Sequence, residues 1–155
     1  RDLHLSIRRQ RQMCIRDRET TFHEQYDPSL PLVFGNRDQL IQVFRNLTEN
    51  AINYGRESSK INVSAEIMVR IPESGNRGVV IHVRDFGEGI DNELIPWLTE
   101  RFYRVDRARS RSGPMSSTGL GLAIVKHIIA RHRGNLAIQS TIGEGSIFSV
   151  YLPIE

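Results

Sequence analysis

The chain has 155 residues, of which 39% are hydrophobic and 25% are charged, and it contains a single cysteine, Cys14. This length suits one domain with its own core; the lone cysteine excludes an internal disulfide framework, the short apolar runs exclude a membrane-spanning helix, and together they favour a cytoplasmic domain. The net charge of +3 comes from residues 1–18, whose six arginines and two aspartates give +4 and leave −1 for the rest, so we expect no specific nucleic-acid partner.

The first part of the chain is predicted to be a tail followed by an extended segment. Residues 1–21 show no clean helical stripe and are interpreted as a tail or as the remnant of a preceding helix, with the folded domain spanning residues 22–155. Between residues 22 and 33, a turn at Asp27-Pro28-Ser29 and a second proline favour extended backbone over helix.

A helix is predicted from about Asn36 to Tyr54. Asparagine is a good N-cap residue, and Gly55 is a typical helix stop. One narrow apolar stripe recurs at helical spacing and is expected to be buried: Leu40, Phe44, Leu47 and Ala51.

Two strands are predicted next, separated by a turn at residues 74–76. Residues 79–84 are apolar enough to be a buried strand. Residues 59–70 alternate strictly between apolar and polar, which is typical of a half-buried strand. The face expected to be buried consists of Ile61, Val63, Ala65, Ile67 and Val69.

The rest of the chain is predicted to supply a short helix, a loop, a longer helix ended by Gly134, and a terminal hairpin. In that order they span residues 92–100, 104–118, 120–132, and 135–140 with 146–152. The whole set predicts an α+β fold, a two-layer α/β sandwich whose mixed, mostly antiparallel sheet carries helices on one face.

Three asparagines, Asn46, Asn50 and Asn53, share one face of the first helix at i, i+4 and i+7. A solvated face near a helix end would explain them, although asparagine is a mediocre helix former. Their amide oxygens could instead coordinate Mg²⁺ bound to nucleotide phosphates, because Mg²⁺ takes one or two protein oxygens besides phosphate oxygens. Tyr54 could pack on an adenine or ribose, or belong to the core.

An aspartate and a glycine pair follow the second strand directly, in the run Asp85-Phe86-Gly87-Glu88-Gly89-Ile90. Glycine lets the backbone turn tightly and approach a flat ligand. A carboxylate at such a turn can accept a hydrogen bond from the exocyclic amine of adenine, but a turn capped by aspartate would look the same.

A second glycine motif, Thr118-Gly119-Leu120-Gly121-Leu122, opens the longer helix. The free N–H groups and the dipole at a helix N-terminus favour an anion such as a phosphate. A flexible loop of small residues is the alternative, and the run is neither a Walker A loop nor a Rossmann fingerprint.

Taken together, these motifs resemble the N, G1 and G2 boxes of the ATP-binding catalytic domain of sensor histidine kinases, within the superfamily shared with gyrase, Hsp90 and MutL. Residues 46–54 resemble the N box, residues 85–90 the G1 box and residues 119–126 the G2 box. Residues 100–106 resemble the F box, and residues 143–148 the closing glycine motif of the last hairpin. The phosphate-regulon sensor kinase of alphaproteobacteria is the subtype that looks closest.

The resemblance implies a Bergerat-type sandwich that binds ATP and Mg²⁺, with residues 103–118 as a lid over the nucleotide. It implies catalytic roles for Asn46, Asn50 and Arg104, with Asn50 as the Mg²⁺ ligand and Asp85 holding the adenine amine. It further implies a dimerisation domain that carries the phosphoacceptor histidine, a response regulator downstream, and a homodimeric parent kinase anchored in the inner membrane. The implied nucleotide contacts are Asn50, Asn53, Tyr54, Asp85, Gly87, Gly89, Ile90, Phe102, Arg104, Thr118, Gly119, Leu120, Gly121, Leu122 and Ser146.

Two departures from the family pattern keep alternatives open. The chain lacks the family's phosphoacceptor motif, so the acceptor is expected on another domain. Asn53 stands where the family usually carries a basic residue, which leaves a non-catalytic nucleotide-binding module as one alternative. A gyrase-type ATPase is the other, although Asn46 stands where such enzymes carry the glutamate that activates water.

Overall fold

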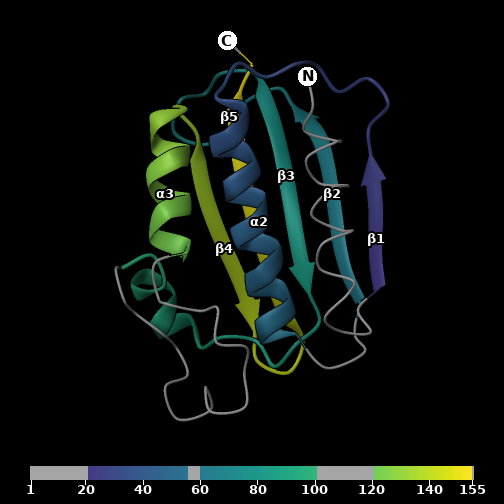
Figure 1. Ribbon diagram of the computed structural model, residues 1–155, viewed down its shortest axis with the longest axis vertical. Coiled ribbons are helices and arrows are strands. Elements are labelled where there is room, and N and C mark those ends of the chain that lie inside the picture. The colour runs from purple at the N-terminus through teal and green to yellow at the C-terminus, as the bar shows by residue number, and fades with distance from the viewer. Residues whose placement is uncertain (1–20, 56–59, 101–120, 155) are drawn as a thin grey trace.

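The computed structural model of the chain describes residues 21–55, 60–100 and 121–154. These residues form one five-stranded sheet with the strand order β1-β2-β3-β5-β4, and the helices α2 and α3 lie on one of its faces (Figure 1). In chain order the elements are β1 (Thr21–Tyr26), α2 (Arg37–Tyr54), β2 (Lys60–Met68), β3 (Gly78–Asp85), the 3₁₀ helix η1 (Asn92–Trp97), α3 (Gly121–Arg131), β4 (Asn135–Thr141) and β5 (Gly145–Pro153). The predicted α+β sandwich with helices on one face is confirmed.

The sheet is antiparallel except at one edge. Strands β2, β3, β5 and β4 pair antiparallel with their neighbours, and β1 pairs parallel with β2, with Thr21 opposite Lys60. The segment predicted only as extended backbone is therefore the parallel edge strand of a mixed sheet.

The helix α2 begins and ends where its sequence predicts. The side chain of Asn36 accepts a hydrogen bond from the backbone N–H of Gln39, and the N–H of Gly55 donates to the carbonyl of Ala51. Three members of the predicted stripe are buried and Leu40 is half-buried, while Val43 and Thr48 widen the buried face. The hydroxyl of Thr48 donates to the carbonyl of Phe44 at 2.8 Å, which satisfies it inside the core.

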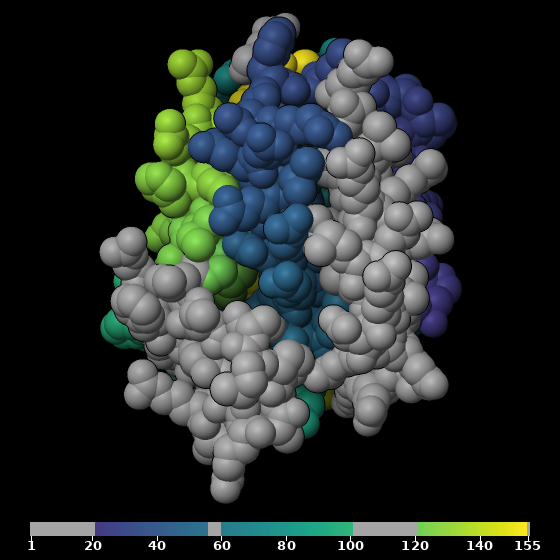
Figure 2. All heavy atoms as spheres, viewed as in Figure 1, coloured from purple at the N-terminus to yellow at the C-terminus, as the bar shows by residue number. Residues whose placement is uncertain are grey.

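The core lies between the sheet and the two helices. Phe44 and Leu47 from α2 meet Ile129 from α3 and Ile61 and Ile81 from the sheet, all almost fully buried. Burial of each such side chain contributes about 1.5–3 kcal/mol to stability. The helices α2 and α3 also contact each other, and they lie side by side in Figure 2.

Two sequence predictions need correction. Val69 was expected on the buried face of its strand, but β2 ends at Met68 and the side chain of Val69 is 80% exposed. The chain bends away from the sheet there, so the alternation no longer reports burial. The helix predicted over residues 92–100 is a single 3₁₀ segment, and Pro96 lies inside it.

A histidine joins the two helices at the end of the fold opposite the glycine motifs. The Nδ1 of His132 donates to the carbonyl of Ile128 at 2.7 Å, which leaves Nε2 to accept from the backbone N–H of Asn36 at 3.0 Å. The N-cap of α2 is thereby fixed to the last turn of α3.

Within the described part of the chain, none of the helices combines the length and the hydropathy that a membrane span requires.

Candidate functional site

The sequence motifs meet at one end of the molecule. The last turns of α2, the end of β3, the first turn of α3 and the β4–β5 turn all lie at the lower end of Figure 1. Specific contacts hold them together. The Nδ2 of Asn46 donates to the carbonyl of Gly121 at 3.2 Å, and the N–H of Gly143 donates to the carbonyl of Glu88 at 2.7 Å.

Asp85, the last residue of β3, is the most unusual group at this end. Its side chain is 1% exposed, and its Oδ1 accepts from the backbone N–H of Gly87 at 2.9 Å. Its Oδ2 is buried and has no hydrogen-bond partner. Burial raises the pKa of Asp85, and the N–H groups of Gly87 and Ser146 and the charge of Arg84 only partly oppose this. A buried acceptor oxygen without a donor is costly, so this one fits a ligand that brings a donor.

The loop after Asp85 is held by the terminal hairpin. The backbone N–H of Ile90 donates to the hydroxyl of Ser140 at 2.6 Å, and that hydroxyl lies 2.8 Å from the hydroxyl of Ser146. Ser146 lies opposite Asp85 in the β3–β5 ladder and is almost fully buried. Ser140 was missed by the sequence analysis, although its place opposite Ser146 in the predicted hairpin was the available signal.

Two glycines are required here by close backbone approach. A Cβ on Gly87 would lie 2.0 Å from the carbonyl oxygen of Tyr54, at the end of α2. Gly145 has φ +118°, and a Cβ on it would lie 2.2 Å from the carbonyl oxygen of Asp85. The loop therefore packs directly against α2 on one side and β5 against the end of β3 on the other.

The three asparagines on α2 are half-buried, so they do not form a solvated face. Asn50 keeps its Nδ2 buried without a hydrogen-bond partner. Asn46 is bonded to the first residue of α3, and Asn53 lies in the last turn of α2. Asn50 and Asp85 thus bring unpaired buried polar atoms to the same end of the fold.

Some of the remaining predicted site residues lie in the part of the chain that the structure describes, and others lie outside it. Tyr54 closes α2, Leu122 packs against the core from the first turn of α3, and Ile90 is buried in the core. Gly89 adopts φ +81° beside the carbonyl of Thr141. Outside the described residues lie Phe102, Arg104, Thr118, Gly119 and Leu120, with the predicted lid at 103–118.

Comparison with known proteins agrees with this geometry. Residues 35–155 match the family model of the histidine kinase-, DNA gyrase B- and HSP90-like ATPases. The chain is 39% identical to the sensor histidine kinase RppB of Synechocystis sp. over 121 residues. The match covers 78% of this chain and 25% of RppB. It is 40% identical to the phosphate regulon sensor protein PhoR of Pseudomonas aeruginosa, covering 76% of this chain and 24% of that protein.

A solved structure is similar over nearly the whole chain. The catalytic domain of the histidine kinase ThkA superposes with a TM-score of 0.79 at 26% identity, covering 99% of this chain and 93% of that one. The chain spans about a quarter of the length of the curated relatives RppB and PhoR. Because the sequence match and the fold agree, the chain belongs to the histidine kinase-, DNA gyrase B- and HSP90-like ATPase family, and within it the chain is similar to the sensor histidine kinases.

Proposed function

We propose that this chain is the catalytic domain of a two-component sensor histidine kinase and that it transfers the γ-phosphate of ATP to a histidine on a separate dimerisation domain. Family membership and the likeness to sensor histidine kinases support the use of ATP. The observation that carries the proposal is the unpaired Oδ2 of Asp85, buried beside a glycine turn at the same end of the fold as Asn50.

Asp85 is assigned to adenine recognition. The exocyclic amine of adenine is a donor, and it would satisfy the unpaired Oδ2 while Oδ1 keeps its bond to Gly87. Guanine carries a carbonyl at that position and would set an acceptor against an acceptor, so the same carboxylate selects adenine. Tyr54, Gly89 and Ile90 are assigned to the walls of this base site.

Asn50 is assigned to the magnesium and phosphate end of the nucleotide. Its amide fits such a group because it offers a neutral oxygen, and its buried Nδ2 still lacks an acceptor, which a phosphate oxygen could supply. Bound Mg²⁺ would supply neutralisation of phosphate charge. Asn53 brings no charge, so the arginines of residues 101–111, which carry a net +4 in the sequence, are assigned to the phosphates, with Arg104 first among them.

Transfer to a protein is favoured over hydrolysis by Asn46. Hydrolytic members of the superfamily need a carboxylate at this position to activate water, and an amide cannot accept that proton. The amide of Asn46 is instead bonded to Gly121, which makes it a positioning residue between the two helices that frame the site. Phosphoryl transfer needs mainly positioning and charge neutralisation, so the site requires no nucleophile of its own.

The rest of the assignment concerns the parent protein. Residues 22–155 are assigned to the catalytic domain and residues 1–21 to a tail or to the end of a preceding helix. The parent kinase is proposed to be a homodimer anchored in the inner membrane, with this domain in the cytoplasm and a response regulator as its downstream partner. Its alphaproteobacterial phosphate-regulon subtype stays a prediction.

The test is transfer of radiolabelled phosphate from ATP, with Mg²⁺, to a separately supplied dimerisation domain of a phosphate-regulon sensor kinase. We expect labelling of its histidine by the wild-type chain and loss of labelling with Asn50→Ala. Gln42→Ala is the matched control, because Gln42 lies on the exposed face of the same helix and should leave transfer unchanged.

Each alternative predicts a different result in that assay. A folded chain that binds ATP but labels no histidine of any supplied dimerisation domain would point to a regulatory nucleotide-binding module. Steady release of inorganic phosphate without an acceptor would point to an ATPase of the gyrase type.

A further inference from the structure

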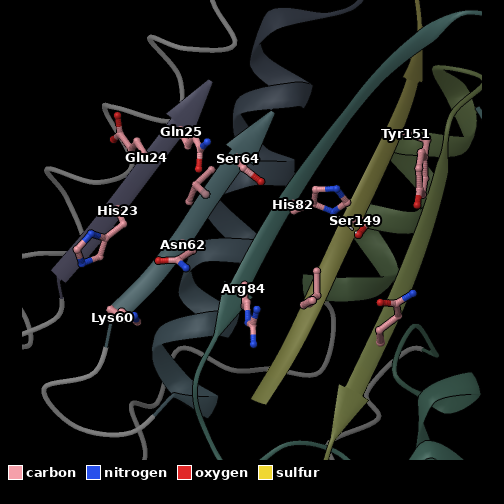
Figure 3. Close-up of a pocket in the computed structure, with 13 residues that line it drawn as sticks. His23, Glu24, Gln25, Lys60, Asn62, Ser64, His82, Arg84, Ser149 and Tyr151 are labelled. Carbon is pink, nitrogen blue, oxygen red and sulfur yellow. Dashed lines mark hydrogen bonds between the residues drawn. The ribbon is translucent and has the colours of Figure 1, made fainter. Parts of the chain in front are cut away.

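The face of the sheet that turns away from α2 and α3 carries a hollow of about 660 Å³. Figure 3 shows polar side chains projecting into it from β1, β2, β3 and β5, with the helices behind the sheet. We call this hollow the rear groove. Its lining includes His23, Asn62, Ser64, His82 and Ser149.

Two cations lie at the end of the rear groove where β2 begins and β3 ends. The Nζ of Lys60 lies 4.8 Å and the Cζ of Arg84 4.6 Å from the centroid of the Phe86 ring. Both side chains are exposed, and neither forms an ion pair with a carboxylate among the described residues. One aromatic ring thus holds two positive charges close together without neutralising them.

The middle of the rear groove is rich in hydrogen-bonding groups, and its lining at β1 also includes the carboxylate of Glu24. In the sheet register Asn62 lies opposite both His23 and Arg84, so a row of polar side chains crosses β1, β2 and β3 beside the cationic end. Further along β3, the Nδ1 of His82 lies 2.6 Å from the hydroxyl of Ser149, and its Nε2 lies 3.7 Å from Glu66. The groove therefore runs from a positive end toward a carboxylate at its far margin.

We propose that the rear groove binds an acidic, extended segment of a partner protein, with its carboxylates at Lys60 and Arg84. The hollow is lined by side chains from neighbouring strands of one sheet face, which suits an extended chain better than a small molecule. Lys60 and Glu66 are six residues apart on β2, which at about 3.3 Å per residue is about 20 Å along the groove, the length of about six extended residues of a partner. Glu66 repels acidic side chains from the opposite end and so sets the direction of the segment.

The rear groove is separate from the candidate nucleotide site. Arg84 and Asp85 are neighbours in β3, so their side chains point to opposite faces of the sheet. A segment in the groove and a nucleotide at Asp85 can therefore be present together, and the two proposals can fail independently.

The test measures binding of fluorescein-labelled hexaglutamate to the full chain at low salt by fluorescence polarisation. We expect the double variant Lys60→Ser/Arg84→Ser to weaken binding about tenfold, since two charge pairs are lost. The matched control Arg70→Ser/Arg77→Ser removes the same charge from exposed positions outside the groove and should change the affinity less than about twofold. All variants keep the basic residues 1–18, so the contribution of these residues to hexaglutamate binding cancels when the affinities of the variants are compared.

Three outcomes decide the proposal. Selective weakening by the groove variant, with backbone amide shifts at Asn62 and His82 when the wild type is titrated, supports it. Equal weakening by both variants overturns it, because the interaction would then follow net charge alone. Inorganic tripolyphosphate that binds at Lys60 and Arg84 as tightly as hexaglutamate also overturns it, in favour of a small-anion site. The amide shifts decide the question even where the double variant fails to fold.

Discussion

Replacement of Asp85 by asparagine separates the structural role of this carboxylate from the adenine contact that we propose for it. Asparagine has the same shape, and its carbonyl oxygen can keep the bond that Oδ1 accepts from Gly87. That orientation puts the amide NH₂ where the unpaired Oδ2 now lies. A donor then faces the donor of adenine, so the variant should fold and fail to bind the base.

The size of the effect follows from the bond that is lost. A hydrogen bond to a charged group is worth about 1.5–3 kcal/mol, and two donors left facing each other add to this. We therefore expect a loss of about 3 kcal/mol, which is about a 100-fold increase in the Kd of ATP. Isothermal titration with a non-hydrolysable ATP analogue measures it.

The same variant should be no less stable than the wild type at neutral pH. Burial raises the pKa of Asp85, so this group contributes stability that is fully present below the ordinary value of 3.8 and is lost as the pH rises through the higher folded value. Asparagine does not titrate. Any thermal advantage of Asp85→Asn at neutral pH should therefore shrink as the pH falls toward 3.8, as thermal melts across that range would show.

The matched control is Asp38→Asn. It replaces an exposed carboxylate in the first turn of α2, the helix whose last turns border the site. It should leave ATP affinity unchanged. An unchanged ATP affinity in a folded Asp85→Asn protein would refute the assignment of the adenine contact, and a thermal advantage that grows toward acid pH would refute the electrostatic reasoning.

Three further substitutions test the framework of the site. Gly87→Ala should lower the free energy of unfolding by about 1–3 kcal/mol, because the added Cβ would lie 2.0 Å from the carbonyl oxygen that ends α2. Gly121→Ala should lower it little, because its Cβ would lie 3.9 Å from the nearest atom. Urea unfolding compares the two variants, and equal losses would contradict the packing. Ser140→Ala should lower the free energy of unfolding by about 1–2 kcal/mol, because it leaves the backbone N–H of Ile90 unpaired. Hydrogen exchange at that amide should become faster, and unchanged exchange would speak against the bond. His132→Ala should cost about 1–2 kcal/mol, because it removes the hydrogen bonds that link α2 to the end of α3, while replacement of the exposed His127 of α3 by alanine should be neutral. A similar melting temperature for both variants would rule the link out.

Local signals in the sequence were enough for most of the fold. Asn36 and Gly55 marked the ends of α2 because caps are short-range devices that the neighbouring residues decide. The alternation from Ile61 to Ala65 and the turn at residues 142–145 located the antiparallel strands for the same reason. The parallel pairing of β1 with β2 could not be predicted locally, since it joins Thr21 to Lys60 across a whole helix.

The candidate site was predictable in its residue types and order but not in its contacts. Asp85 was singled out from the glycines that follow it, yet only the fold shows that one of its oxygens is buried and unpaired. Ser140 escaped notice because a serine in a hairpin strand is ordinary until its partner across the molecule, the N–H of Ile90, is known. Val69 was misjudged because alternation says nothing about where pairing stops.

The unpaired atoms of Asn50 and Asp85 lower the thermal stability of the domain at the positions that we propose for nucleotide binding. Each is a buried polar atom without a hydrogen-bond partner, so replacement of its side chain by a well-packed apolar residue would raise the melting temperature. Directed evolution under heat challenge, or redesign that minimises unsatisfied polar atoms, would therefore discard these two positions early. A thermostabilised variant that keeps the proposed phosphate transfer must be selected with nucleotide present, or with residues 50 and 85 held fixed.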